Sequence, residues 1–244
     1  MPTKSQLHLL TLIALIFGNH CFAQSDPQAA DSKWISLTER WEPALFGGEG
    51  EVTVKEGVIE MLYGDPITGV SWTGPIDPIK KPMRLERQAS EPSKSAADSA
   101  EAVRLPRDRY ELRWECCRDD GYDFLCAFTF PVGEGYTSLV MGGWGGGTTG
   151  LSCIDGDDAS SNDSTKYIAF QNDRWYGVRV RVSAKQIVVW IDDKEVIKQG
   201  REGHEFDVRG EVEACKPFGI ANFQCDSRIR NVQIRRLSKQ ASLK

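Results

Sequence analysis

The stretch Tyr110-Glu-Leu-Arg-Trp-Glu-Cys116 decides the fold class of this chain, because apolar and charged residues alternate in it without exception. Successive side chains of an extended strand point to opposite faces, so Tyr110, Trp114 and their apolar neighbours share one face. The charged residues share the other face. This pattern predicts a strand that buries one side against a core.

Similar runs lie on both sides of this strand, and turn residues separate them. Glu56-Gly57 and Asp192-Asp193 have the turn chemistry that closes two predicted hairpins. After the N-terminal segment, no stretch of about 11 residues spaces its apolar residues at the helical period, so few helices are expected. The other predicted strands cover residues 51–62 (the first hairpin), 124–130, 136–141, 178–182, 187–191 with 195–197 (the second hairpin), and 231–237. Many short strands with Gly-rich turns predict an all-β sandwich or barrel.

The first 23 residues are expected to be a cleavable signal peptide. Lys4 supplies a positive start, an apolar run extends from Leu7 to Phe17, and small residues precede a cleavage point after Ala23. The apolar run is shorter than the roughly 20 residues that cross a bilayer. The sequence therefore predicts a protein that is secreted, periplasmic or attached to the cell surface, without a transmembrane segment.

One domain is expected after this segment. Residues 24–32 are polar and small and are predicted to be a linker, residues 33–238 to form the β-sandwich, and residues 239–244 to be a tail. Residues 80–106 are charged and small and are predicted to be a flexible insertion loop, with a short helix around residues 95–103 as the alternative. The formal net charge of −5, without a basic stripe, argues against nucleic acid as a partner.

Six of the seven cysteines and one of the three histidines follow the predicted cleavage point. An even cysteine set in an exported chain predicts at least one disulfide. Cys215 and Cys225 flank a short turn and are the candidate pair; buried free thiols are the alternative. The single remaining histidine, His204, lies in a polar turn and is expected at the surface.

An acidic loop spans residues 155–163. Asp155, Asp157 and Asp163 offer oxygen ligands of the kind that calcium prefers, so a divalent cation is a candidate cofactor. The alternative is a solvated turn in which Asp and Asn side chains satisfy nearby backbone groups.

Glu111 and Glu115 share the charged face of the first strand. A glycosidase typically needs two carboxyl groups about 5–9.5 Å apart, whereas four extended residues span about 13 Å. Arg113 between them favours mutual neutralisation. A charged, solvated face is therefore the preferred interpretation.

A glycine-rich segment, Gly142-Gly-Trp-Gly-Gly-Gly-Thr-Thr-Gly150, holds six glycines and Trp144. It lacks the Lys-Ser/Thr pair of a phosphate-binding loop. An exposed indole on such a rim suits stacking against a sugar ring. The alternative places Trp144 beneath the loop.

These motifs occur in an order that resembles a known family. The run from Met141 to Gly156, then Asn172-Asp-Arg-Trp-Tyr176 and Trp190-Ile-Asp-Asp193, is similar to the 3-keto-disaccharide hydrolase-like domains of exported bacterial proteins. The resemblance implies a concanavalin A-like jelly roll of two antiparallel sheets, with rim loops that bind carbohydrate. It also implies hydrolysis of glycosides oxidised at the sugar 3-position.

Two functions follow from the motifs and the resemblance. The first is an exported carbohydrate-active hydrolase, with Asp155 as acid, base or metal ligand, Asn162 as an orienting group and Trp144 as a stacking platform. The second is a non-catalytic, lectin-like or surface-assembly module that uses the same rim. Both predict a carbohydrate partner.

Overall fold

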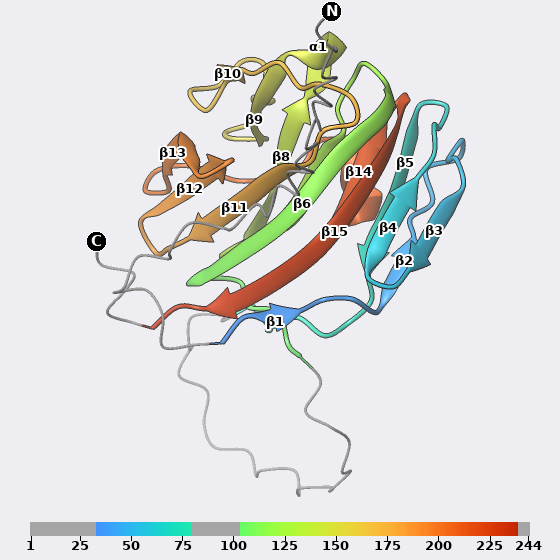
Figure 1. Ribbon diagram of the computed structural model, residues 1–244. Helices are drawn as coiled ribbons and strands as arrows, with labels where there is room; N and C mark the ends of the chain where they lie inside the picture. The colour runs from blue at the N-terminus through green and yellow to red at the C-terminus, as the bar shows by residue number, and fades with distance from the viewer. Residues whose placement is uncertain (1–32, 80–102, 239–244) are drawn as a thin grey trace, which may run out of the picture.

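Two antiparallel sheets face each other and form a sandwich (Figure 1). The structure is a computed structural model that describes residues 33–79 and 103–238. The architecture confirms the predicted all-β jelly roll of two antiparallel sheets. The predicted signal peptide, the linker, most of the insertion and the tail lie outside the described residues.

The larger sheet has eight strands, and its two longest members, β6 and β15, run side by side across the front of Figure 1. Its path in space is β13 (Lys194–Gly200), β12 (Gln186–Ile191), β11 (Tyr176–Val182), β6 (Tyr110–Gly121), β15 (Cys225–Arg236), β4 (Val58–Met61) and β3 (Val52–Lys55), with β1 (Ile35–Ser36) paired to β15.

The second sheet has seven strands. In order they are β10 (Lys166–Tyr167), β9 (Thr148–Ser152), β8 (Gly135–Gly142), β7 (Cys126–Val132), β14 (Gly219–Phe223), β5 (Ile67–Trp72) and β2 (Trp41–Pro43). Helical structure in the described residues amounts to a four-residue turn, α1 (Gly143–Gly146), and a 3-10 segment, η1 (Gly210–Cys215). No helix in the described ranges is long and apolar enough to cross a membrane.

Both predicted hairpins are confirmed by their backbone angles. Glu56 and Gly57 have φ values of 52° and 77° between β3 and β4, and Asp192 and Asp193 have φ values of 48° and 62° between β12 and β13. Two consecutive left-handed residues define the tight turn whose twist matches antiparallel strands. Asp and Gly tolerate this conformation better than most residues.

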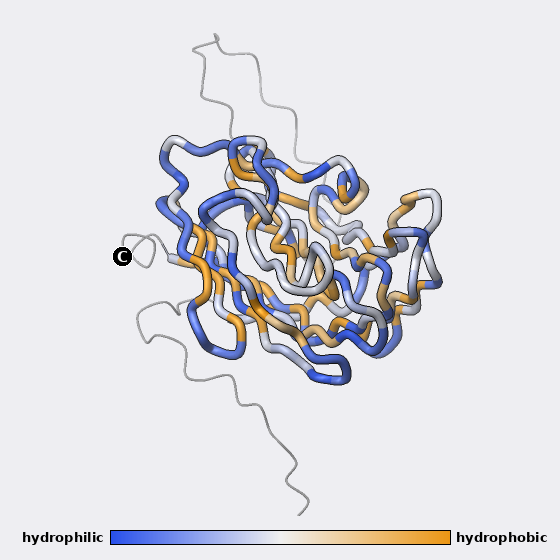
Figure 2. Tube along the Cα trace, turned by 90° about the horizontal axis from the view of Figure 1, so that it is seen from above, coloured by the Kyte–Doolittle hydropathy of each residue, from blue (hydrophilic) through white to orange (hydrophobic). Residues whose placement is uncertain are grey.

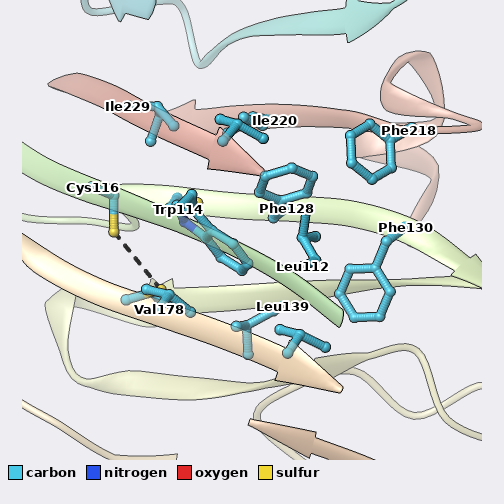
Figure 3. Close-up of a cluster of buried hydrophobic side chains, with 14 of the residues drawn as sticks. Leu112, Trp114, Cys116, Phe128, Phe130, Leu139, Val178, Phe218, Ile220 and Ile229 are labelled. Carbon is cyan, nitrogen blue, oxygen red and sulfur yellow. Dashed lines mark hydrogen bonds between the residues drawn. The ribbon is translucent and has the colours of Figure 1, made fainter. Parts of the chain in front are cut away.

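The core lies between the sheets and is built from aromatic residues (Figure 3). Trp114 of β6 lies 4.5 Å from Phe128 of β7, and Phe128 lies 5.0 Å from Phe218, measured between ring centroids. All three side chains are fully buried. Burial of each contributes about 1.5–3 kcal/mol. Figure 2 shows the same arrangement as apolar strand segments surrounded by polar loops.

The end of the predicted insertion belongs to the sandwich. Leu105 is completely buried, pairs with Ile76, and donates its backbone N–H to the carbonyl of Pro75 at 2.9 Å. The predicted boundary at residue 106 was therefore too late, because the apolar Leu105 was grouped with the charged residues before it.

The outer face of β6 is not the solvated surface that the alternation predicted. Glu111 is fully buried, and its carboxylate accepts hydrogen bonds from Arg181 Nε at 2.7 Å and Arg235 Nε at 2.7 Å. Arg179 adds a third at 3.2 Å and stacks 3.8 Å from the ring of Trp190. Burial raises the pKa of Glu111, but the adjacent Arg181 and Arg235 outweigh it and hold the pKa below its ordinary value.

Glu115 is also shielded. Its side chain pairs with Arg230 Nε at 2.5 Å, and the residue is 7% exposed. The solvated interpretation of this face was wrong because flat aromatic and guanidinium groups on β11, β12 and β15 cover the carboxylates, and a single strand does not reveal its neighbours.

Candidate functional site

A cleft of about 280 Å³ opens on the outer face of the seven-stranded sheet. Its floor is the surface of five strands, and three segments between strands form its walls. The floor residues are Ile67, Ala127, Ser138, Val140, Ser152 and Phe223; the walls are Asp123, Phe124 and Trp144 on one side and Arg209, Glu211 and Val212 on the other.

The second wall exists because the chain after Phe206 crosses over the outer face of this sheet. Val208, Val212 and Cys215 pack there against Ile67 of β5 and Ala221 of β14. These contacts cover one part of the outer face with apolar side chains. The cleft is the part that lies between this covering segment and the turn that carries Trp144.

Small side chains keep the floor close to the sheet backbone. Ala127 of β7 and Val140 of β8 are paired residues that pack together with Ala159. Ser138 Oγ lies 2.8 Å from Thr129 Oγ1, so its hydroxyl already has a partner on the sheet. The floor is therefore mainly an apolar shelf.

Trp144 stands at the edge of this shelf in an unfavourable conformation. Its φ and ψ values are 52° and 51°, and 44% of its surface is exposed. The left-handed conformation costs roughly 1–2 kcal/mol for a residue with a Cβ, and exposure of a large apolar ring adds no stability. The indole lines the cleft, as the stacking interpretation requires.

Asp123 fixes the turn that holds Trp144. Its Oδ2 accepts the backbone N–H of Gly145 at 2.9 Å, and its Oδ1 accepts that of Phe124 at 2.7 Å. The buried Arg118 donates from Nη1 to the carbonyl of Asp123 at 2.8 Å. Asp123 is thus fixed through its backbone by Arg118 and binds the Trp144 turn through its carboxylate.

The opposite wall carries a guanidinium between two carboxylates. Arg209 Nη1 donates to Asp158 Oδ2 at 2.7 Å, and Arg209 Nε donates to Glu211 Oε2 at 3.2 Å. The Arg209 guanidinium carbon lies 5.7 Å from the centre of the Trp144 ring, so the two walls meet across the cleft.

Both carboxylates are ionised at neutral pH. The hydrogen bond from Arg209 lowers the pKa of Glu211. Burial raises the pKa of Asp158, but hydrogen bonds from Ser160 and the charge of Arg209 bring it below its ordinary value. Sequence reasoning missed Asp123, Asp158, Arg209 and Glu211. The Asp158–Arg209 and Asp123–Gly145 contacts join residues 51 and 22 positions apart, and the local Arg209–Glu211 pair forms no recognised motif.

Asp155, the predicted catalytic residue, does not line the cleft. Its Oδ2 lies 2.6 Å from His204 Nδ1, and its Oδ1 accepts the backbone N–H of Glu205 at 2.7 Å. The Glu205 N–H and then His204 lower the pKa of Asp155. His204 is at the surface as expected, but it lines a separate hollow together with Glu202 and Glu205.

Asn162, the predicted orienting group, stabilises its own loop. Its Nδ2 donates to the carbonyls of Leu151 and Asp158, each at 2.8 Å, and its Oδ1 accepts from Ser164 Oγ at 2.6 Å. It is not among the residues that line the cleft. Asn162 therefore does what the alternative interpretation of the acidic loop expects: its side chain satisfies nearby backbone groups.

The predicted calcium ligands do not converge in the described part of the chain. No three or more His, Cys, Asp or Glu side chains are grouped there to hold a metal ion, and this applies to Asp155, Asp157 and Asp163. A divalent cation such as calcium at this loop stays an untested prediction.

The predicted disulfide between Cys215 and Cys225 is wrong. All six described cysteines are free and buried. The extended strand β14 separates Cys215 from Cys225 and spans about 16 Å, too far for a bridge. Cys225 Sγ instead donates to the carbonyl of Phe124 at 3.3 Å. These cysteines are buried free thiols, which is the alternative that the sequence left open.

No protein-family model matches the chain, and no curated protein matches it. The resemblance to 3-keto-disaccharide hydrolase-like domains therefore stays a prediction.

Solved structures match over most of the chain. The chain is similar to the carbohydrate-binding module CBM66 from Bacillus subtilis, with 10% identity, 81% of this chain and 96% of that chain covered, and a TM-score of 0.43. Domain 4 of AbnA, a GH43 extracellular arabinanase from Geobacillus stearothermophilus in complex with arabinotriose, has 12% identity, coverage of 83% and 86%, and a TM-score of 0.45. A Bacillus subtilis protein of unknown function with a galectin-like fold has 8% identity, coverage of 86% and 97%, and a TM-score of 0.49. A shared function does not follow from likenesses this weak.

Proposed function

We propose that this protein binds carbohydrate in the cleft of the seven-stranded sheet, with Trp144 as the stacking platform. The observation that carries the proposal is the exposed indole of Trp144, held in a left-handed conformation at the edge of an apolar shelf. A sugar presents C–H groups on its ring faces and hydroxyls at its edges. The shelf and indole suit the faces, and the charged walls suit the edges.

The polar groups of the walls are arranged for binding. Asp123 and Glu211 are hydrogen-bond acceptors on opposite walls, and Arg209 keeps N–H groups beyond those that hold its carboxylates. Each is fixed by other residues before a ligand arrives. Such preorganisation reduces the entropy that binding costs.

A glycan array tests this proposal with the wild-type protein and Trp144→Ala. Wild type should bind at least one glycan class, and Trp144→Ala should reduce that signal about tenfold, since stacking on an aromatic ring contributes about 1 kcal/mol or more. Tyr167→Ala is the matched control, because Tyr167 is 83% exposed on the same sheet but does not line the cleft. Absence of any signal that depends on Trp144 would refute the proposal.

Hydrolysis of 3-keto-glycosides is a second candidate, favoured by the Asp155–His204 pair. A carboxylate bound to Nδ1 orients an imidazole and leaves Nε2 to accept a proton. In a 3-keto sugar the carbonyl acidifies the adjacent C–H. Removal of that proton expels the leaving group, which takes up a proton, and water then adds to the resulting C=C bond to complete the hydrolysis. The purified protein should then cleave a 3-keto-glucoside, and His204→Gln should abolish the cleavage. An inactive wild type, with and without divalent metal, would exclude this candidate.

A further inference from the structure

The charged groups around the cleft are mostly carboxylates. Asp123 and Glu211 line it on opposite walls, and Asp158 lies directly behind Arg209. Arg209 is the one cationic side chain among the described lining residues. Three carboxylates against Arg209 and the buried Arg118, which donates to the backbone carbonyl of Asp123, leave this end of the sheet with a local excess of one negative charge.

The single guanidinium is already compensated. Asp158 takes Nη1 of Arg209, while Glu211 takes Nε and Nη2. An incoming anionic group at Arg209 would have to compete with two carboxylates that are in place. The positive charge of Arg209 is therefore neutralised by its two carboxylate partners, and Arg209 does not serve as a binding site for an anion.

The carboxylates around the cleft can only accept further hydrogen bonds from a ligand. An ionised carboxylate only accepts hydrogen bonds and has about four acceptor positions. Asp123 uses two of them for the backbone N–H groups of Phe124 and Gly145. The side chain of Glu211 is 53% exposed. A ligand must donate to these groups, through hydroxyl or ammonium hydrogens.

Resting on the proposed function, we infer that the cleft selects sugars by charge, accepting neutral and amino sugars and rejecting uronic acids and sulfated sugars. A protonated amino group meets two ionised acceptors, whereas a sugar carboxylate or sulfate meets like charge on both walls. The preference for an amino sugar over its uronic acid counterpart is expected to be about tenfold or more at low salt. It shrinks in high salt, because the walls are partly exposed and their charges are screened.

The first test is a glycan array that displays neutral, amino, uronic acid and sulfated oligosaccharides. The signals that disappear in Trp144→Ala define the ligands of the cleft. We expect these ligands to be neutral or amino sugars. If they are mostly acidic, the charge inference is overturned while the proposed function stands; if no signal depends on Trp144, the proposed function fails and the inference fails with it.

The second test measures the charge effect with one variant. Glu211→Gln removes a carboxylate and frees two N–H groups of Arg209. The variant is titrated with an amino oligosaccharide that binds on the array and with its uronic acid counterpart. Its affinity for the amino sugar should fall about threefold to tenfold, and its affinity for the acidic sugar should rise. Glu51→Gln is the control, because Glu51 is exposed beside β3 of the other sheet. Equal effects of both variants, or unchanged selectivity in Glu211→Gln, would overturn the inference.

Discussion

At the residue scale, Trp144 shows how a binding role and stability oppose each other. The left-handed backbone at this position is favourable for glycine and unfavourable for tryptophan, and the flanking Gly142 and Gly145 have φ values of 78° and 82°. Gly146 has a φ of 101°, so residues 142–146 hold four positions with positive φ, of which only Trp144 carries a side chain. Selection for stability alone would favour glycine at all four.

This strain is measurable by comparing two truncations of Trp144. Trp144→Gly and Trp144→Ala both remove the indole, but alanine retains the unfavourable φ of 52°. The free energy of unfolding of the glycine variant should exceed that of the alanine variant by about 1 kcal/mol. Urea unfolding of the two proteins checks this difference. An alanine variant as stable as the glycine variant would show that position 144 is not strained.

A second prediction at the residue scale concerns the buried Glu111. Glu111→Gln leaves Arg179, Arg181 and Arg235 without their shared carboxylate, so the free energy of unfolding should fall by about 3–5 kcal/mol. The control is Glu60→Gln on the exposed part of β4, with an expected change within about 0.5 kcal/mol. If both variants unfold at the same urea concentration as the wild type, the charged cluster contributes nothing to stability.

At the element scale, local chemistry predicted the hairpins better than it predicted the longest strand. The expected strand at residues 231–237 begins at Cys225 instead. A register shift after Arg230, with Asn231 at a φ of 55°, moves the apolar residues out of phase. Such a bulge breaks the two-residue period by which a strand is recognised in a sequence.

The candidate site was also only partly predictable from local sequence patterns. The glycine-rich motif identified Trp144, because an aromatic residue among glycines is visible locally. The wall opposite it includes Arg209, whose partner Asp158 lies 51 positions away in the sequence. Nothing in the local pattern around either residue announces that contact. The acidic loop was recognised, but Asp158, which binds the cleft residue Arg209, was not singled out from its neighbours.

The Asp158–Arg209 contact predicts a pH dependence. The folded pKa of Asp158 lies below its ordinary value of 3.8, so its stabilising effect is present above that pH and is lost as the pH falls through the folded pKa. Asp158→Asn should therefore lower stability at pH 7, and its difference from wild type should shrink as the pH falls below about 4. Denaturant unfolding at several pH values measures this, with the exposed Asp163→Asn as control. A difference that stays constant down to pH 2 would contradict the ion pair.

At the scale of the whole molecule, the sandwich is held by packing and by buried charge pairs in the described residues, where the six cysteines form no bridges. Burial raises the pKa of the Cys215 and Cys225 thiols to about 12. Thiolates react with alkylating reagents and thiols do not, so the folded protein should resist modification at these positions.

Thiol counting checks this prediction. Iodoacetamide at pH 8 should leave the six described cysteines unmodified in the folded protein and should modify all six after unfolding without reductant. Peptide mapping by mass spectrometry assigns each position. Any of these cysteines that stays unmodified in the unfolded, unreduced protein would reveal a disulfide.

The two outer faces of the sandwich differ in a way that directs the search for a ligand. The eight-stranded sheet covers its outer face with paired arginines, carboxylates and aromatic rings. The seven-stranded sheet instead has a cleft with a mainly apolar floor beside the exposed Trp144. We therefore expect carbohydrate on the second sheet.

A crystal structure of the protein soaked with the oligosaccharide that binds best on the array tests this account most directly. The account predicts a sugar ring stacked on the indole of Trp144, with its hydroxyl or amino groups directed to Asp123 and Glu211. A sugar bound instead on the outer face of the eight-stranded sheet, or beside His204 with the cleft empty, would contradict it.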